Sequence, residues 1–300
     1  MLLLVGLIAL VQGVVYVLVS QASQRSAMEH IRQNLGVGAR VFQQSLQERI
    51  ETLSTGARLM AEDYAIKPLL MREPDVATLR STLYSFTTRV GSDLISLFTA
   101  EGDFLASTDP KLRPEELAPF RQLIDTATQS DLERASGYAV LHGQLQVLVV
   151  VPLYAPRPQV AAWFGLAYPI DRAFAQKIQE VSQLEVTFLS GAVTEDPRVL
   201  ATTVAAPGGA ELSAAFATAT VDAVAADGTT SLVRLAGEPY VTRFEPLPRL
   251  DGGPIRIALQ RSLTAELAPA RALERVVLGI ALAALLAASL AAWSLAREVS

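Results

Sequence analysis

The chain has 300 residues, 51% hydrophobic and 18% charged, so it is too apolar for a disordered protein and long enough for about two domains. Its 25 basic and 30 acidic residues argue against nucleic-acid binding, because phosphate recognition needs concentrated positive charge. The absence of cysteine excludes disulfides, thiol catalysis and cysteine-ligated metals, and two histidines are too few for a histidine-rich metal site.

Hydrophobic residues are concentrated in two uncharged segments, residues 1–19 and 276–296. A helix of 20 or so apolar residues crosses a hydrocarbon core of about 30 Å, so both segments are predicted to be transmembrane helices in a lipid bilayer. For the first segment a cleaved signal peptide is the alternative. No positively charged region precedes it, however, and the apolar run is longer than a usual signal core.

The orientation in the membrane is weakly encoded. Arg25, Arg271 and Arg275 flank the inner ends of the two segments, and Arg297 lies beyond the second. A simple count of positive charge would place the middle of the chain in the cytoplasm. Long loops cross membranes largely regardless of charge, so we expect a two-pass protein of a bacterial inner membrane with residues 20–275 in the periplasm or outside.

Apolar residues recur at spacings of three and four along residues 20–73, which predicts a stalk helix of some forty residues or more. The stripe comprises Ile31, Leu35, Ala39, Phe42, Leu46, Ile50, Leu53, Ala57, Met60 and Tyr64. Such a rod is typical of a coiled-coil or dimer stem, so we expect a homodimer. Gly36 and Gly38 indicate a local irregularity, and Pro68 ends or bends the helix.

Residues 74–190 are predicted to form a first unit of helices and antiparallel strands. The expected elements are a helix after Asp75 to about Arg89, a hairpin over 94–107, a helix over 114–128, strands over 137–141, 145–153 and 160–168, and a helix over 171–184. The strands are indicated by a change of the apolar period to two and by turns containing glycine or proline.

A second, smaller unit over residues 191–262 repeats this order in outline. Strands are expected over 186–189, 199–204, 231–235, 240–244 and 255–260, with an alanine-rich helix over 210–225. The strand over 186–189 is the first strand of the repeated order, although we place the boundary between the two units after residue 190. Residues 263–275 are predicted to be a connecting helix that continues into the second transmembrane segment.

The most telling segments are Gln44–Arg49 (QSLQER), Leu94–Asp109 (LISLFTAEGDFLASTD) and Ala258–Leu263 (ALQRSL). With the order of elements, they resemble the extracytoplasmic double Cache (PAS-like) sensor region of bacterial transmembrane receptors. The resemblance implies an α+β fold: two tandem PAS-like units on a long N-terminal helix, flanked by two transmembrane helices. It also implies a non-enzymatic sensor of a small-molecule ligand.

The tail, residues 297–300, resembles the start of a HAMP-like cytoplasmic linker. In that family the output domain is often a diguanylate cyclase, with or without a phosphodiesterase, in cyclic-di-GMP signalling, and sometimes a histidine kinase. The chain is therefore expected to be the sensor part of a longer receptor. Small residues at Gly279, Ala283, Ala284, Ala287, Ala288, Ala291 and Ala292 form either a dimer face of the second span or merely reflect abundant alanine.

No catalytic or phosphate-binding motif is present, so we expect no catalytic residues, metal or cofactor. A Cache-type pocket lies between the sheet and the helix or loops that cover it. The candidate ligand-binding residues are Arg89 and Asp93 at a helix–strand junction, and Tyr138, Tyr154, Trp163 and Tyr168 on strands. Arginine beside aromatic rings suits a carboxylate or phosphate, whereas the alternative is that the rings are core and Arg89 a surface cation.

Other interpretations stay open. The Tyr, Arg, Trp and Asp set of amino-acid-sensing Cache domains is not found in the right order, so amino-acid binding is not assigned. His30 and His142 are interpreted as structural, the first on the stalk and the second in a hairpin turn. The rival functions are a domain that docks a protein partner without a small-molecule ligand, and a membrane-anchored enzyme or assembly factor.

Overall fold

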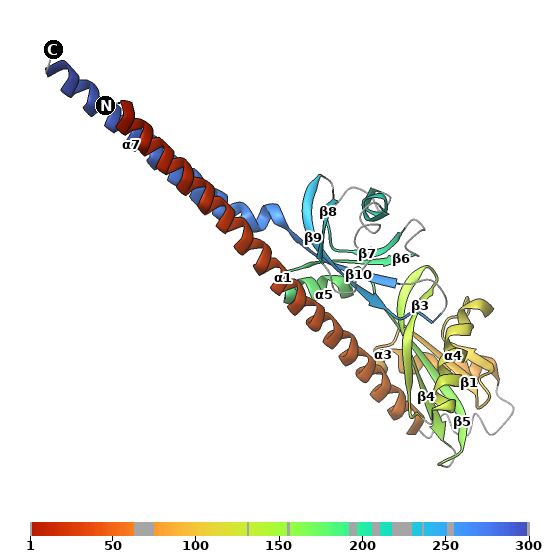
Figure 1. The fold of residues 1–300 in the computed structure, drawn as a ribbon. Helices are drawn as coiled ribbons and strands as arrows, with labels where there is room; N and C mark the ends of the chain where they lie inside the picture. Colours follow the sequence, from red (N-terminus) through yellow and green to blue (C-terminus); the bar gives the residue numbers. More distant parts are fainter. Residues whose placement is uncertain are drawn as a thin grey trace.

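The computed structural model describes residues 2–62, 75–130, 132–154, 157–191, 197–205, 211–217, 230–235, 237–250 and 255–298. The side chains of residues 2–9, 281, 285, 288–289 and 291–298 are also outside the description. Figure 1 shows a long two-helix rod with two sheet units lying against the part that is distant from both termini. The chain is α+β, as predicted.

One helix, α1 (Leu2–Glu62), runs along both sheet units. Its apolar stripe from Ile31 to Met60 is buried within the single chain, and the side chains pack with residues of both sheets in one continuous core. The interpretation of this stripe as a coiled-coil stem is therefore corrected, because the periodicity identified the buried face but not what covers it. Tyr64 and Pro68 lie outside the described residues.

The first sheet is antiparallel and has the strand order β2-β1-β5-β4-β3. Its strands are β1 (Leu94–Thr99), β2 (Phe104–Ser107), β3 (Ala135–Leu141), β4 (Gln144–Tyr154) and β5 (Val160–Pro169). Helix α3 (Val76–Val90) precedes them and α4 (Pro114–Gln129) crosses between β2 and β3. The Asp75 carboxylate caps α3 by accepting from the Thr78 N–H at 3.2 Å, and Gly91 ends it with a φ of 68°.

The second sheet repeats the same topology in the order β7-β6-β10-β9-β8. Its strands are β6 (Glu185–Ser190), β7 (Arg198–Thr202), β8 (Thr230–Leu235), β9 (Glu238–Leu247) and β10 (Ile255–Ser262). Helix α5 (Arg172–Ser182) joins the two sheets. Residues 185–190 thus belong to the second sheet, although the predicted unit boundary lay after them. Of the helix predicted over 210–225, only residues 211–217 are described, and they are helical.

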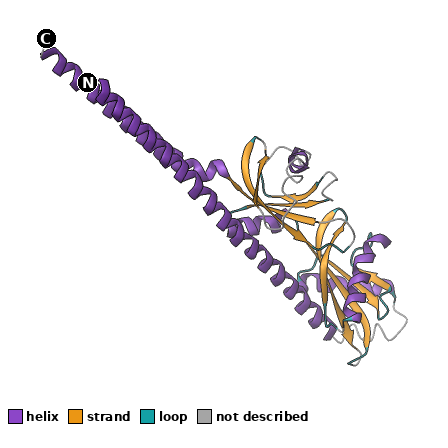
Figure 2. Ribbon diagram, in the orientation of Figure 1, coloured by secondary structure: helices purple, strands orange, loops and turns teal. Residues whose placement is uncertain are grey.

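The two faces of each sheet are covered differently (Figure 2). In the first sheet, Val147, Val149 and Phe164 point toward α1, whereas Val150 and Trp163 belong to a separate core under α4. The alternation follows from the two-residue period of a strand. In the second sheet, the α1 side again belongs to the continuous core, and a third core lies on the opposite side.

After β10 the chain continues directly into α7 (Leu263–Glu298), which packs alongside α1 and returns to the end of the rod where the N-terminus lies. Among the described residues, no helix has an apolar stretch long enough to cross a membrane. Much of both predicted spans, residues 1–19 and 276–296, lies outside the residues whose side chains are described.

Two glycines of α1 give a matched test of how closely the helix approaches the sheet units. A Cβ built at Gly38 would overlap the buried Leu184 side chain, whereas at Gly36 the nearest atom, Nη1 of Arg243, is 4.0 Å away. We expect Gly36→Ala to stabilise the chain by about 1 kcal/mol through helix propensity. Gly38→Ala should destabilise it by about 1–2 kcal/mol through overpacking.

Urea unfolding of the full chain in detergent micelles measures both free energies. Equal stabilisation by the two alanines would contradict the close approach of α1 to the connection between the sheets.

Candidate ligand site in the first sheet unit

The middle of the space between the first sheet and α4 is filled with aromatic side chains. Phe98 and Phe120 are fully buried, with ring centroids 5.5 Å apart. Their rings lie directly over Gly165 of β5, where an added Cβ would come within 2.7 Å of Phe120 and 2.9 Å of Phe98. Glycine thus allows the rings to rest on the central strand, and a ligand in this unit would bind near the ends of α4.

A cleft of about 280 Å³ lies at the C-terminal end of α4. It is lined by Ala100, Ala127, Thr128, Leu132, Tyr154, Arg157, Pro158, Val160 and Trp163. Trp163 is 3% exposed and donates its Nε1–H to the Ala100 carbonyl at 3.3 Å, which fixes the ring as one wall. The Arg157 guanidinium carbon lies 4.8 Å from the centroid of the Tyr154 ring, a cation–π contact.

A second cleft of about 260 Å³ adjoins the first and shares Tyr154 and Arg157 with it. Here the Glu133 carboxylate lies between two arginines, 3.1 Å from Arg58 and 3.5 Å from Arg157. All three side chains are at least half exposed, and such ion pairs contribute little to stability. An anionic group of a ligand could therefore replace Glu133 as the partner of Arg157 at small cost.

The structure brings two of the six predicted site residues, Tyr154 and Trp163, to one cleft. Arg89 and Asp93 are exposed at the α3–β1 junction. Tyr138 and Tyr168 lie on the opposite face of the sheet, packed against the α1 core. This separation follows from strand alternation, because Tyr168 is an odd number of residues from Trp163.

The two tyrosines on the α1 side, Tyr138 and Tyr168, pack against the continuous core. The Arg49 guanidinium lies 3.5 Å from the centroid of the Tyr168 ring. Burial raises the pKa of the Tyr138 hydroxyl. The contact between Arg49 and Tyr168 joins α1 to the sheet, and neither tyrosine lines a cleft.

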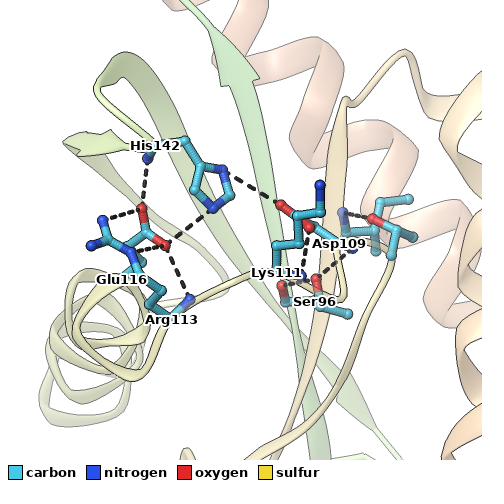
Figure 3. A network of polar contacts seen from close by, with 9 residues as sticks. Ser96, Asp109, Lys111, Arg113, Glu116 and His142 are labelled. Atoms are coloured by element: carbon cyan, nitrogen blue, oxygen red, sulfur yellow. Dashed lines mark hydrogen bonds and ion pairs between the residues drawn. The ribbon is translucent and has the colours of Figure 1, made fainter.

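Sequence reasoning missed Arg157, which stands in the Pro-rich turn between β4 and β5. It also missed a polar cluster at the other end of α4, shown in Figure 3. The buried Glu116 carboxylate accepts the backbone N–H groups of Arg113 at 3.0 Å and His142 at 2.6 Å, and the Arg113 guanidinium at 3.1 Å. Glu116 is at the N3 position of α4, but the N-cap is Arg113 and not Ser or Thr, so the sequence carries only half of the usual capping-box signal.

Glu116 is strongly biased toward its charged form. Burial alone raises the pKa of this carboxyl, but the hydrogen bonds from Arg113 and from the backbone of His142 and Arg113 outweigh it and hold the pKa at about 2. The position near the N-terminus of α4 favours a negative charge as well. Among the described residues, no group of three or more His, Asp or Glu side chains is arranged to hold a metal ion.

The second sheet carries a row of polar side chains on the side away from α1. Strand register aligns Ser231, Thr242, Gln260 and Glu185 across four strands. Thr187 donates to Gln260 Oε1 at 3.0 Å, but within the described chain Ser231 Oγ, Thr242 Oγ1 and Gln260 Nε2 have no hydrogen-bond partner. Such buried atoms are usually satisfied by ordered water, so this face is more polar than its counterpart under α4.

Comparison with known proteins identifies a family. Residues 29–267 match the model of dCache_3, described as the double sensory domain of two-component sensor kinase. No curated protein sequence matches the chain.

Several solved structures are similar to this chain. The extracellular domain of vpHK1S-Z8, a protein assigned as a histidine kinase, is 13% identical with a TM-score of 0.50, over 83% of this chain and 96% of that domain. The ligand-binding domain of the Pseudomonas fluorescens chemoreceptor CtaA, in complex with L-isoleucine, is 17% identical with a TM-score of 0.49, over 83% and 97%. The Vibrio cholerae histidine kinase DctB sensor domain is 13% identical with a TM-score of 0.49, over 78% and 98%.

The low pKa of Glu116 makes a prediction about acid stability. A carboxyl whose pKa is depressed by folding stabilises the folded state above its unfolded pKa, and this contribution disappears as the pH falls from about 4.5 to about 2. The difference in unfolding free energy between the wild type and Glu116→Gln should therefore shrink by up to about 3 kcal/mol over this range. Urea unfolding of the full chain at several pH values measures it.

Glu115→Gln is the matched control, because the Glu115 side chain is 64% exposed on the same helical turn. A wild-type-to-Glu116→Gln difference that stays constant with pH would contradict the assignment.

Proposed function

The chain belongs to the dCache_3 family of double sensory domains, which confirms the double Cache resemblance, and we propose that it is the ligand-sensing module of a transmembrane signalling receptor. In this proposal residues 1–19 and 276–296 span the bacterial inner membrane, and residues 20–275 lie in the periplasm or outside. The module itself is non-catalytic. Its output domain, a diguanylate cyclase or phosphodiesterase or a histidine kinase, would follow residue 300.

The observation that carries this proposal is the direct continuation of β10 into α7. Strand β10 is the central strand of the second sheet, and it ends at Ser262 where α7 begins at Leu263. Arg261 secures the junction by donating to the Glu266 carboxylate at 3.1 Å. A displacement of the second sheet relative to α1 would therefore move α7 along α1 as a slide, rotation or tilt.

The chemistry of the α4 cleft indicates the class of ligand. Its walls are mostly apolar, with the Trp163 ring on one side and Arg157 and Tyr154 at the entrance to the second cleft. The volume of about 280 Å³ equals roughly nine water molecules at about 30 Å³ each. A small carboxylate with an apolar body fits this lining, since the guanidinium pairs with a carboxylate in a bidentate way.

The ligand can shift the receptor only by its difference in affinity for two conformations. A hundredfold preference for one conformation corresponds to about 2.7 kcal/mol. In the proposed homodimer, two copies pair through the membrane segments and their small residues. In this arrangement the two α7 helices would move relative to each other.

Ligand binding at the α4 cleft is tested by thermal unfolding of the full chain in detergent micelles with phenylacetate as the probe. We expect a rise in Tm, because a ligand that binds only the folded state stabilises it by about 2.7 kcal/mol at a hundredfold excess over Kd. Arg157→Gln should weaken binding by roughly tenfold or more, which is the contribution of a hydrogen bond to a charged group.

Arg121→Gln is the matched control, because Arg121 lies on the outer side of α4 with its side chain 53% exposed and pairs with Asp103. No stabilisation of the wild type, or an equal loss in both arginine variants, would contradict a carboxylate site at Arg157.

Transmission through α7 is tested in a fusion of the chain, at Ser300, to a HAMP linker and a histidine kinase. Four glycines inserted after Ala268 should interrupt the helix while leaving both sheets and the cleft intact. We expect phenylacetate still to raise Tm but no longer to change kinase activity. A kinase response that survives the insertion would contradict transmission through a continuous α7.

The filled centre of the α4 space favours a second candidate function. Because Phe98, Phe120 and Trp163 already occupy the space between sheet and helix, the unit could dock a protein partner without binding a small molecule. This alternative predicts that no small carboxylate raises Tm. The kinase of the fusion would then respond only when a partner protein is present.

A further inference from the structure

A proton-binding arrangement lies at the N-terminal end of α4, opposite the cleft. His142 and Gly143 form the two-residue turn between β3 and β4, with φ angles of 51° and 77°. Turns of this kind favour asparagine, aspartate or glycine, and a histidine with positive φ carries a conformational cost of about 1 kcal/mol. Histidine is one of the residues that tolerate positive φ, so the turn allows this ring but does not require it.

Both nitrogens of the His142 ring face carboxylates from other elements (Figure 3). Nε2 lies 3.2 Å from Oε2 of Glu116 on α4, and Nδ1 lies 3.5 Å from Oδ2 of Asp109 in the loop between β2 and α4. A neutral imidazole has a single N–H, so one of its nitrogens would direct a lone pair at a carboxylate oxygen. The protonated ring has two N–H donors and satisfies both carboxylates.

The surrounding charges are divided between the two elements that face the ring. On the α4 side, Glu116 shares its charge with Arg113, which also lies 3.2 Å from Glu115. On the loop side, Asp109 accepts the backbone N–H of Lys111 at 2.8 Å but has no guanidinium partner among the described contacts. The His142 ring thus lies between the loop carboxylate and the helix carboxylate.

The loop side of the cluster is connected to the sheet by buried hydroxyls. The Asp109 N–H donates to Ser107 Oγ at 3.1 Å, and Ser96 Oγ donates to Ser107 Oγ at 3.1 Å. Ser96 and Ser107 are at most 1% exposed on β1 and β2. Asp109 thus links the His142 ring to the edge of the sheet formed by β1 and β2.

We propose that His142, Asp109 and Glu116 form a proton-sensing site that fastens the N-terminal end of α4 to the β3–β4 turn at acidic pH and loosens it at neutral pH. Imidazole is the side chain whose charge changes between about pH 5 and 8. Protonation gives the ring two N–H groups and a positive charge that attracts both carboxylates, so the fastened form is present at low pH and is lost as the pH rises.

The site is coupled to the cleft through α4, and this part of the inference rests on the proposed ligand-sensing function. Ala127 and Thr128, near the C-terminal end of the helix, line the cleft, while Glu116 near its N-terminal end contacts His142. Phe120, Leu123 and Ile124 between them form the core under the helix. A helix that is free at one end can tilt on this core and change the width of the cleft at the other end.

Hydrogen exchange of the full chain in lipid nanodiscs tests the site without any ligand. After correction for the intrinsic pH dependence, we expect the amides of residues 113–118 and 141–144 to exchange about tenfold more slowly at pH 5.5 than at pH 7.5. His142→Gln should remove this difference, and Asp109→Asn should reduce it. His30→Gln, which changes the other histidine of the chain, is the matched control and should retain it.

A pH difference that persists in His142→Gln, or one that is absent from the wild type, would overturn the proposal. If His142→Gln unfolds, its Tm at pH 7.5 will reveal this, and Asp109→Asn then provides the test, because it removes one carboxylate and leaves the turn unchanged. Because no ligand is present, failure of the carboxylate cleft would leave these results unaffected. The two proposals are therefore tested separately.

Discussion

The burial of one helix face against two sheets is the constraint on which the rest of the structure depends. Nine side chains of α1, from Ile31 to Met60, are at most 7% exposed and belong to one core with residues of both sheets. Each large side chain contributes about 1.5–3 kcal/mol by leaving water. Moving either sheet off α1 would expose many of these side chains together. Both sheets therefore stay attached to α1, and only small displacements relative to this helix are compatible with the buried core.

The opposite faces of the sheets are free from this constraint and carry the features that can respond to a signal. In the first unit, α4 has aromatic residues beneath its middle, an open cleft at one end and a charged polar cluster at the other. Close packing over Gly165 opposes a shift of the middle of α4. In our proposals a ligand acts at one end of α4 and a proton at the other, and the helix would tilt about its packed centre.

The sequence allowed the strands, the long helix and its buried stripe to be predicted, because these features repeat at short, regular spacings. It could not identify what buries the stripe, since periodicity describes a face and not its partner. The functional side chains were harder to predict for a related reason. Glu116 and His142 are 26 residues apart and meet only because β3 returns beside α4. Tyr138 and Tyr168 were assigned to the site because they are aromatic residues on predicted strands, whereas strand alternation places them on the α1 side.

The repeated topology explains how a change in the first unit can reach α7. In each sheet the fifth strand of the unit is the central one, β5 in the first and β10 in the second, and the chain leaves each unit through it. After β5 it enters α5, whose Asp171 cap accepts the Phe174 N–H at 2.9 Å, and α5 packs on α1 before β6 begins the second sheet. After β10 it enters α7. A central strand is hydrogen-bonded on both edges, so it moves with its whole sheet. In the proposed sensor, each unit would therefore pass a displacement on through its central strand.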